Sequence, residues 1–309
     1  MGPVLADRAQ AGIGPGPAPA GKSWRDLRVR LLSAGLLAPV GLVCIWLGGW
    51  LFSILVMAGI AGAGAECAGL LRHRLASLRG GVLVAWPVIA CLAALTTGRW
   101  EEAALMLVAP LLLGPAIAAG TVAIGIAGLA LLWLRFMTGT GWDSVLFVLL
   151  VVWSSDTFAY IAGRALGGPK LAPRISPGKT WSGSAGGLFG AMLVGAILAL
   201  LLPSPSGSGQ VLAALRGLGT GLLLGLVSQA GDLAESALKR RSGVKDSGRL
   251  IPGHGGLLDR FDGLLAAAPV AALLSLAAPH HIGFWYAFGD MSHPDGNLSA
   301  SGPPALGTN

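Results

Sequence analysis

The sequence has few charged residues and almost no cysteine. Only 11% of its 309 residues are Asp, Glu, Lys or Arg, whereas 54% are hydrophobic, and the mean hydropathy is +0.72. This composition excludes a soluble globular protein and predicts an all-α, polytopic integral membrane protein. Cys44, Cys67 and Cys91 lie inside apolar runs without metal-ligand spacing. We therefore expect small core residues and not disulfide or metal-site residues.

Apolar runs long enough to cross a bilayer, which takes about 20 residues, predict about nine transmembrane helices. They fall near residues 31–47, 49–70, 81–97, 102–118, 119–136, 144–163, 183–202, 210–230 and 263–286. The first 22 residues lack the continuous apolar run of a signal peptide. The predicted regions are a disordered cytoplasmic lead (1–25), N-terminal transmembrane helices (26–140), a C-terminal transmembrane region with the clustered charges (141–287) and a flexible tail (288–309).

The distribution of Lys and Arg predicts the orientation, because these residues favour cytoplasmic loops. With the N-terminus inside, 18 of the 21 basic residues fall in cytoplasmic segments, and only Arg99, Arg135 and Arg216 fall outside. The net charge of +7 therefore reflects orientation at anionic headgroups and phosphate ligands, and we expect no nucleic-acid partner.

The first unusual segment runs from Trp153 to Gly187. Asp156 lies in or near the end of an apolar run, where an unpaired carboxylate costs a few kcal/mol, so it needs a partner or a polar cavity. Four basic residues follow among glycines and prolines, which predicts a cationic loop that can bind phosphate groups. They are Arg164, Lys170, Arg174 and Lys179. A basic loop at lipid headgroups explains the same residues equally well.

The second segment, residues 236–262, holds nine of the 35 charged residues in 27 positions. Just before and within it, Asp232, Glu235, Ser236 and Lys239 are spaced at i, i+3, i+4 and i+7, which places them on one helical face. A carboxylate-bearing helix end in an apolar protein favours a polyanionic ligand with metal ions.

Asp259 and Asp262 share a face at the start of the last predicted helix. They can complement the helix dipole or join Asp232 in binding Mg²⁺, which takes a few carboxylates plus substrate phosphates. The absence of a Cys/His cluster argues against zinc. His254 can be a base or a ligand, but we favour a hydrogen-bonding residue at a turn. Glu66, the other intramembrane acid, is expected to line the polar cavity or to pair with Arg72 or His73.

The run SALKRRSGVKDSGRLIPGHGGLLDRFD (236–262) resembles the signature of the phosphatidate cytidylyltransferase (CDP-diacylglycerol synthase) family. The shared pattern is a Ser, a Lys-Arg pair, Lys-Asp, Pro-x-His-Gly-Gly and Asp-Arg-x-Asp. DTFAYIAGRALGGPKLAPRISPGKT (156–180) resembles a second stretch of that family, whereas the N-terminal spans resemble it only in hydropathy. One position departs: the family's loop commonly continues Lys-Thr-x-Glu-Gly, and this chain has Ser182 in place of the Glu.

The resemblance implies that CTP and phosphatidate react to CDP-diacylglycerol and pyrophosphate at the cytoplasmic face of a bacterial inner (plasma) membrane. It implies Mg²⁺ as cofactor, in two divalent sites held by Asp232 and Asp259, with room for a monovalent cation. Asp246 and Asp262 are implied as supporting ligands. The residues implied to bind the substrates are Arg164, Lys170, Lys179, Ser236, Lys239, Arg240, Lys245, His254, Gly255, Gly256 and Arg260. The implied partners are these substrates and the lipid bilayer, and a homodimer is compatible with the sequence.

Two other function classes stay open. A CTP-dependent polyprenol or lipid-alcohol kinase shares the location and the nucleotide, but it needs a base to activate a hydroxyl. A transporter is favoured by interrupted Gly/Pro spans in two corresponding halves, which this sequence lacks because its clustered charge is confined to the C-terminal half.

Overall fold

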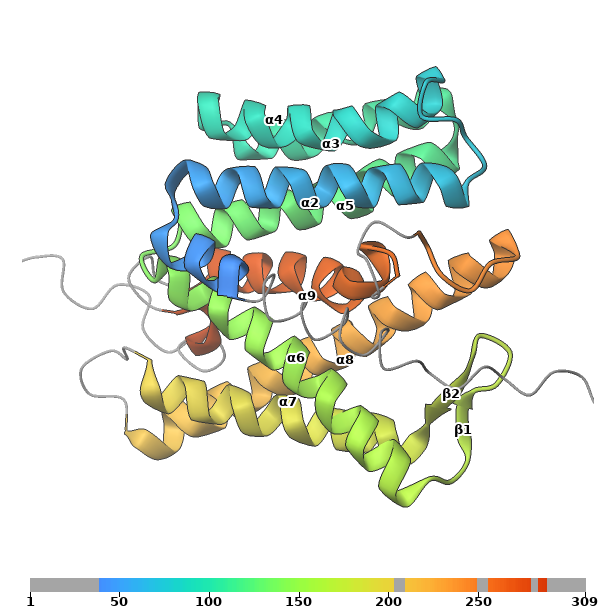
Figure 1. Cartoon of the computed structure of the whole chain (residues 1–309). Coiled ribbons are helices and arrows are strands. Elements are labelled where there is room, and N and C mark those ends of the chain that lie inside the picture. Colours follow the sequence, from blue (N-terminus) through green and yellow to red (C-terminus); the bar gives the residue numbers. More distant parts are fainter. Residues whose placement is uncertain (1–38, 203–208, 249–254, 279–282, 288–309) are drawn as a thin grey trace, which may run out of the picture.

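The computed structural model describes residues 39–202, 209–248, 255–278 and 283–287 (Figure 1). The predicted lead, the predicted tail and His254 lie outside these residues. The described part contains seven helices long and apolar enough to cross a membrane. They are α2 (Gly49–Leu70), α3 (Leu78–Thr97), α5 (Pro115–Phe136), α6 (Gly141–Leu166), α7 (Trp181–Leu201), α8 (Gln210–Ser242) and α9 (Leu258–Ala277). The predicted all-α membrane class is confirmed, but the count of nine is not.

The helix predicted at 102–118 does not form. The chain instead makes the short helix α4 (Trp100–Met106) and the 3₁₀ helix η1 (Ala109–Leu113). Pro110 cannot donate a backbone hydrogen bond and so interrupts the helix. Gly114 then turns with a φ of 129°, and Pro115 begins α5, where its missing N–H is not needed.

Helices α3 and α5 run parallel to each other. A Cβ on Gly120 would lie 2.8 Å from the Leu83 side chain, and one on Gly128 would lie 3.1 Å from Cys91 Sγ. Both contacts therefore advance in the same direction along the two helices. The α4–η1 segment must return the chain across the bundle between them, as Figure 1 shows.

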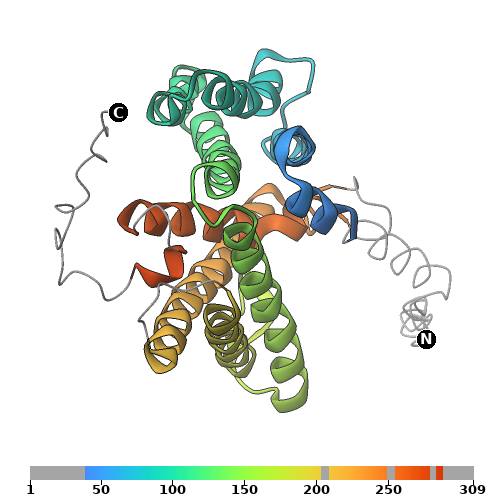
Figure 2. The same cartoon turned by 90° about the vertical axis from the view of Figure 1, so that its left-hand side faces the viewer.

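Helices α2 to α5 form one group and α6 to α8 form another, with α9 packed between them (Figure 2). In the second group, α7 and α8 approach closely through glycines. A Cβ on Gly195, Gly217 or Gly221 would collide with a backbone carbonyl oxygen of the facing helix. Small residues of this kind let membrane helices pack backbone against backbone.

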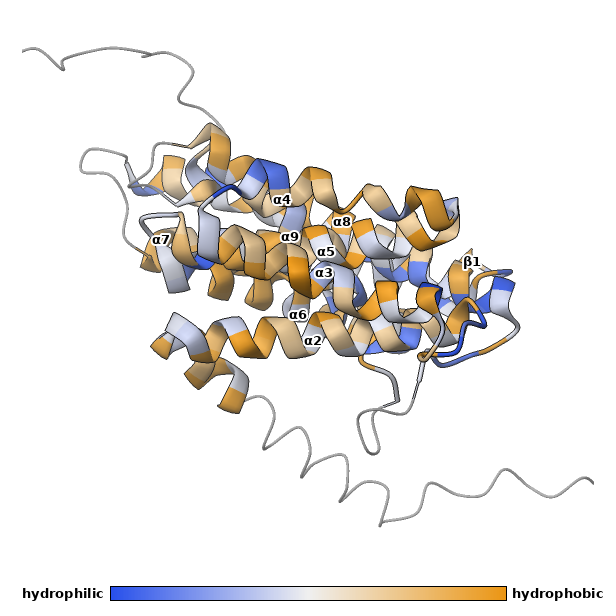
Figure 3. Cartoon of the chain, turned by 90° about the horizontal axis from the view of Figure 1, so that it is seen from above, coloured by the Kyte–Doolittle hydropathy of each residue, from blue (hydrophilic) through white to orange (hydrophobic). Residues whose placement is uncertain are grey.

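The segment predicted as a cationic loop forms an antiparallel hairpin of β1 (Lys170–Ala172) and β2 (Ser176–Thr180) between α6 and α7. Helix α6 continues to Leu166, so Arg164 lies on the helix and not in a loop. Hydrophilic residues gather at the end of the bundle that carries this hairpin (Figure 3).

Helix α8 is much longer than its predicted span of 210–230. It has 33 residues and ends at Ser242, with Gly243 in the left-handed conformation at φ 75°. At 1.5 Å per residue it is about 50 Å long, against about 30 Å for the hydrocarbon core of a bilayer. The stretch from Asp232 to Ser242 is therefore continuous with a membrane helix, although it is rich in charge.

Candidate functional site

A cavity of about 690 Å³ lies at the hairpin end of the bundle. Its walls come from α6, the β1–β2 hairpin, α7, α8 and α9. The charged residues that line it are Asp156, Arg164, Lys179, Asp232, Lys239, Asp259, Arg260 and Asp262. The two segments that the sequence singled out therefore meet in one cavity.

The predicted polar face of α8 is confirmed as helical. Ser236 Oγ donates a hydrogen bond to Asp232 Oδ1 at 3.4 Å, one turn earlier. Lys239 Nζ lies 2.6 Å from Glu235 Oε2, again one turn apart, and both side chains are nearly buried. The carboxylates and the ammonium group of this face are thus paired along the helix.

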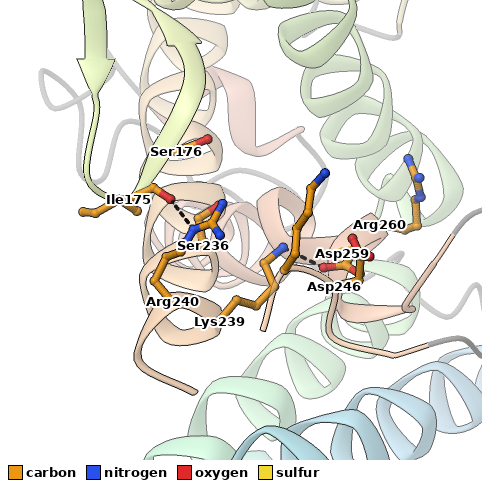
Figure 4. A pocket seen from close by; sticks show the side chains of 9 residues that line it. Ile175, Ser176, Ser236, Lys239, Arg240, Asp246, Asp259 and Arg260 are labelled. Atoms are coloured by element: carbon orange, nitrogen blue, oxygen red, sulfur yellow. Dashed lines mark hydrogen bonds and ion pairs between the residues drawn. The ribbon is translucent and has the colours of Figure 1, made fainter. Parts of the chain in front are cut away.

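Lys239 also joins α8 to α9. Its Nζ donates to Asp259 Oδ1 at 2.6 Å, and Figure 4 shows the two side chains pointing toward each other. Asp259 Oδ2 accepts two further bonds, from the backbone N–H groups of Ser247 and Gly256, both at 3.0 Å. One ammonium group and two backbone donors therefore stabilise Asp259 as an anion.

A second ion pair joins the hairpin to α8, between Lys179 Nζ and Asp232 Oδ2. Gly231, next to Asp232, allows α9 to come close, because a Cβ there would lie 2.5 Å from Ala266 Cβ and 2.8 Å from Asp262 O. This close packing brings Asp232 and Asp262, from different helices, to the same cavity.

A smaller pocket of about 240 Å³ adjoins the first and is the one drawn in Figure 4. It is lined by Ile175, Ser176, Ser236, Lys239, Arg240, Lys245, Asp246, Asp259 and Arg260. Arg240 Nε donates to Ile175 O at 3.1 Å and so ties α8 to the hairpin. Both pockets share Lys239, Asp259 and Arg260, so the Lys239–Asp259 ion pair lies where the two pockets meet.

The structure places most of the predicted site residues in these two pockets. Among the described ones, Lys170, Gly255 and Gly256 line neither pocket, and Lys170 is exposed on β1. Gly255, with a φ of 85°, and Gly256 lie beside Asp259, and the Gly256 N–H is already engaged by that carboxylate. Ser182 lies in the first turn of α7 and donates to Gly167 O, and it does not line either pocket.

An uncharged polar network at the cavity was missed. Ser184 Oγ donates to Gln229 Oε1, and Gln229 Nε2 donates to Ser184 O at 3.1 Å and to Ser155 Oγ at 3.4 Å. Ser184 and Gln229 line the larger cavity. A lone Gln within an apolar run was the available signal, because a buried amide needs hydrogen-bond partners.

The expectation for Glu66 was wrong. Among the described contacts, Glu66 pairs with neither Arg72 nor His73, and it is not among the residues that line the two pockets. Its carboxylate instead accepts hydrogen bonds from the connection between α8 and α9.

The carboxylates of the cavity fit a hard cation such as Mg²⁺ only if a bound ligand supplies further oxygen atoms. Within the residues that the structure describes, no group of three or more His, Cys, Asp or Glu side chains is arranged to hold a metal ion. Asp232 and Asp259 are carboxylates on one cavity, each paired with a lysine. Mg²⁺ is commonly held by one or two carboxylates plus substrate phosphates and water, so these two residues suffice if phosphates bind beside them.

Known proteins match most of this chain. The Cytidylyltransferase family matches residues 28–277. The chain is 40% identical over 264 residues to the phosphatidate cytidylyltransferase of Brucella abortus biovar 1 (strain 9-941), across 80% of this chain and 93% of that protein. It is 46% identical over 129 residues to the Haemophilus influenzae protein of the same name, across 40% and 43% of the two chains. The match to the Pseudomonas aeruginosa protein of that name is 46% over 134 residues, across 43% and 48%.

Proposed function

Because the chain belongs to the Cytidylyltransferase family, we propose that it transfers the cytidylyl group of CTP to phosphatidate, giving CDP-diacylglycerol and pyrophosphate. The observation that carries the proposal is the cavity at one end of a membrane bundle where aspartates of α8 and α9 meet basic residues of α6, β2, α8 and α9. A site of this kind suits two phosphate-bearing substrates, of which one is a lipid.

The reaction places modest demands on the side chains. An ionised phosphate oxygen of phosphatidate attacks the α-phosphorus of CTP, the bond from that phosphorus to the bridging oxygen breaks, and pyrophosphate leaves with the electron pair. Since the nucleophile is already an anion, no activated Ser or Cys and no strong base is required. Catalysis then rests on alignment of two polyanions and on neutralisation of their charge.

The paired charges of the cavity are suited to this task. Lys179 and Lys239 each hold an aspartate in the structure and can neutralise phosphate oxygens when substrates enter. Asp232 and Asp259 are then the residues that would hold Mg²⁺, which supplies charge neutralisation at the α-phosphate and the leaving pyrophosphate.

We assign the two substrates to the two adjoining pockets. The smaller pocket has Arg240 and Lys245 from the charged end of α8 and the connection after it, and these would bind the triphosphate of CTP. The larger cavity extends to Ala159 and Gly163 on the membrane helix α6, and it would receive the lipid phosphate near Arg164. The reacting groups would meet beside Lys239 and Asp259, which line both pockets.

We place the site at the cytoplasmic face of a bacterial plasma membrane. Support comes from the basic residues of the α2–α3 connection, the hairpin and the α8–α9 connection, because Lys and Arg favour cytoplasmic loops. Soluble CTP is also available on that side.

The direct test is an assay of the purified protein with Mg²⁺, labelled CTP and phosphatidate. The expected products are CDP-diacylglycerol and an equal amount of pyrophosphate. Release of CDP together with a phosphorylated lipid alcohol would instead identify a kinase, and absence of any product under these conditions would reject the proposed activity.

A further inference from the structure

Glu66 is buried in α2, with 5% of its surface exposed, although it lies far in sequence from the charged segments. Its carboxylate accepts three hydrogen bonds from the α8–α9 side of the molecule. Ser247 Oγ donates to Oε2 at 2.8 Å, the Leu257 N–H donates to Oε1 at 2.8 Å, and the Leu258 N–H donates to Oε2 at 2.9 Å. Leu257 is the N-cap residue of α9 and Leu258 is its first residue, so a carboxylate of α2 caps the N-terminus of another helix.

Two glycines leave the space that this contact requires. A Cβ on Gly248 would lie 2.5 Å from Glu66 Oε1, and one on Gly256 would lie 2.6 Å from Glu66 Oε2 and would collide with Ser247 Oγ. Any side chain at these positions would therefore push the carboxylate or the serine away. A glycine near each end of the α8–α9 connection therefore leaves room for the Glu66 carboxylate.

The same connection holds Asp259. Ser247 donates its hydroxyl to Glu66 and its backbone N–H to Asp259 Oδ2 at 3.0 Å. Gly256, packed against Glu66, donates its N–H to Asp259 Oδ2 at 3.0 Å. Ser247 and Gly256, whose backbone N–H groups bind Asp259, are therefore the same residues that contact Glu66.

We propose that Glu66 is a positioning residue for the reaction. It anchors the α8–α9 connection to α2 and so fixes the two backbone donors that orient Asp259 toward Lys239. This inference rests on the proposed cytidylyl transfer, in which Asp259 acts. It gives the N-terminal helices a role in the site, which neither the charged segments nor the two pockets reveal.

The test variant is Glu66→Gln, which keeps the size of the side chain but turns one acceptor oxygen into a donor. That NH₂ group faces an N–H or O–H donor, so at least one of the three bonds is lost. We expect kcat to fall about 10- to 100-fold, the typical range for residues that orient a ligand-binding group. The KM for CTP should stay within about threefold, because the substrate-binding lysines and arginines are unchanged. The Mg²⁺ requirement should rise, because Asp259 is no longer held in its orientation.

Two further variants separate positioning from simple destabilisation. Cys67→Ala is the matched control, because Cys67 is the next residue of α2 and is buried with its sulfur facing Gly120 of α5. It should lower the melting temperature and leave kcat unchanged. Ser247→Ala removes the hydroxyl that donates to Glu66 but keeps the N–H that donates to Asp259. Its effect on kcat should be smaller than that of Glu66→Gln and should not add to it in the double variant.

A readout independent of activity is amide hydrogen exchange of the peptide that contains Leu257 and Leu258, measured without substrates. Exchange should accelerate in Glu66→Gln and not in Cys67→Ala. A wild-type kcat in Glu66→Gln, or an equal loss of kcat in Cys67→Ala, would overturn the inference, as would unchanged exchange. A wild-type protein that makes no CDP-diacylglycerol would reject the proposed function instead, and the exchange comparison would still decide whether Glu66 holds the connection.

Discussion

Lys179 on strand β2 forms an ion pair with Asp232 on α8. The two residues are separated by the whole of α7, yet their charged groups meet at the wall of the larger cavity. Together with the Lys239–Asp259 pair, this contact places two lysines on two aspartates. The cavity therefore carries both kinds of charge, as the proposed binding of Mg²⁺ and phosphate groups requires.

The first prediction concerns the two aspartates. Asp232→Asn and Asp259→Asn should each lower kcat/KM at least about 100-fold, equivalent to roughly 2.7 kcal/mol of transition-state stabilisation, because each removes a carboxylate charge that we propose holds Mg²⁺. Activity should be measured on protein whose melting temperature shows that it is folded.

Glu102→Gln is the control, because Glu102 on α4 forms an exposed ion pair with Arg99 and lines neither of the two pockets. It should retain full activity. Near-normal turnover in either aspartate variant would argue against a metal site shared by α8 and α9. Asp246→Asn should have a milder effect, since Asp246 lines only the smaller pocket.

The second prediction concerns Ser182, where the family's pattern has an acid. Ser182 lies in the first turn of α7 and its hydroxyl is bonded to Gly167 O. Asp156 lines the larger cavity, and Glu235 contacts Lys239 beside it, so carboxylates are already available there. Ser182→Glu should therefore change kcat/KM by less than about tenfold, or roughly 1.4 kcal/mol. Ser182→Gln controls for size, and a much larger gain with Glu alone would mean that the site lacks an acid.

The third prediction concerns the close packing of α7 and α8. Gly221→Val should destabilise the protein by about 1–3 kcal/mol, the usual cost of overpacking, because its Cβ would collide with Ala191 O. Gly219→Val is the matched control on the same helix, since no atom lies within 4 Å of a Cβ there. Thermal unfolding in detergent compares them, and equal melting temperatures would contradict the glycine contact.

The fourth prediction concerns sidedness. In a protein without native cysteines, Ser176→Cys on the hairpin and Val244→Cys after α8 should react with a membrane-impermeant thiol reagent only from the cytoplasmic side. Met137→Cys, in the exposed α5–α6 connection at the other end of α5 and α6, should react only from the opposite side. Reaction of Ser176→Cys and Met137→Cys from the same side would reject the orientation.

The local sequence predicted which segments are helical and where the charges cluster. It did not predict which side chains from different helices contact each other. The spacing of Asp232, Ser236 and Lys239 predicted their shared face, because helical period alone decides it. The partner of Lys179 and the position of Glu66 depend on which helices pack together, which local sequence does not reveal. Gln229 was missed because an amide carries no charge, although it needs buried partners just as an ion does.

The prediction of a fourth membrane helix at residues 102–118 was wrong for a different reason. Its hydropathy is that of a membrane helix, but Pro110, Gly114 and Pro115 break the backbone into α4, η1 and the start of α5. Apolar composition shows that a segment can lie in lipid, whereas the hydrogen bonds that proline lacks decide whether it is one helix.

The length of α8 links the reaction to the membrane around it. One rigid rod of 33 residues carries both the lipid-embedded half and the charged residues from Asp232 to Lys239. A thinner or thicker bilayer changes the tilt of such a rod, because the mismatch between apolar length and hydrocarbon thickness is relieved by tilting. Tilting would shift Asp232 and Lys239 relative to the plane of the headgroups in which the lipid phosphate lies. Turnover should therefore pass through an optimum as the acyl chains of the host vesicles are lengthened, even when the phosphatidate supplied is kept the same.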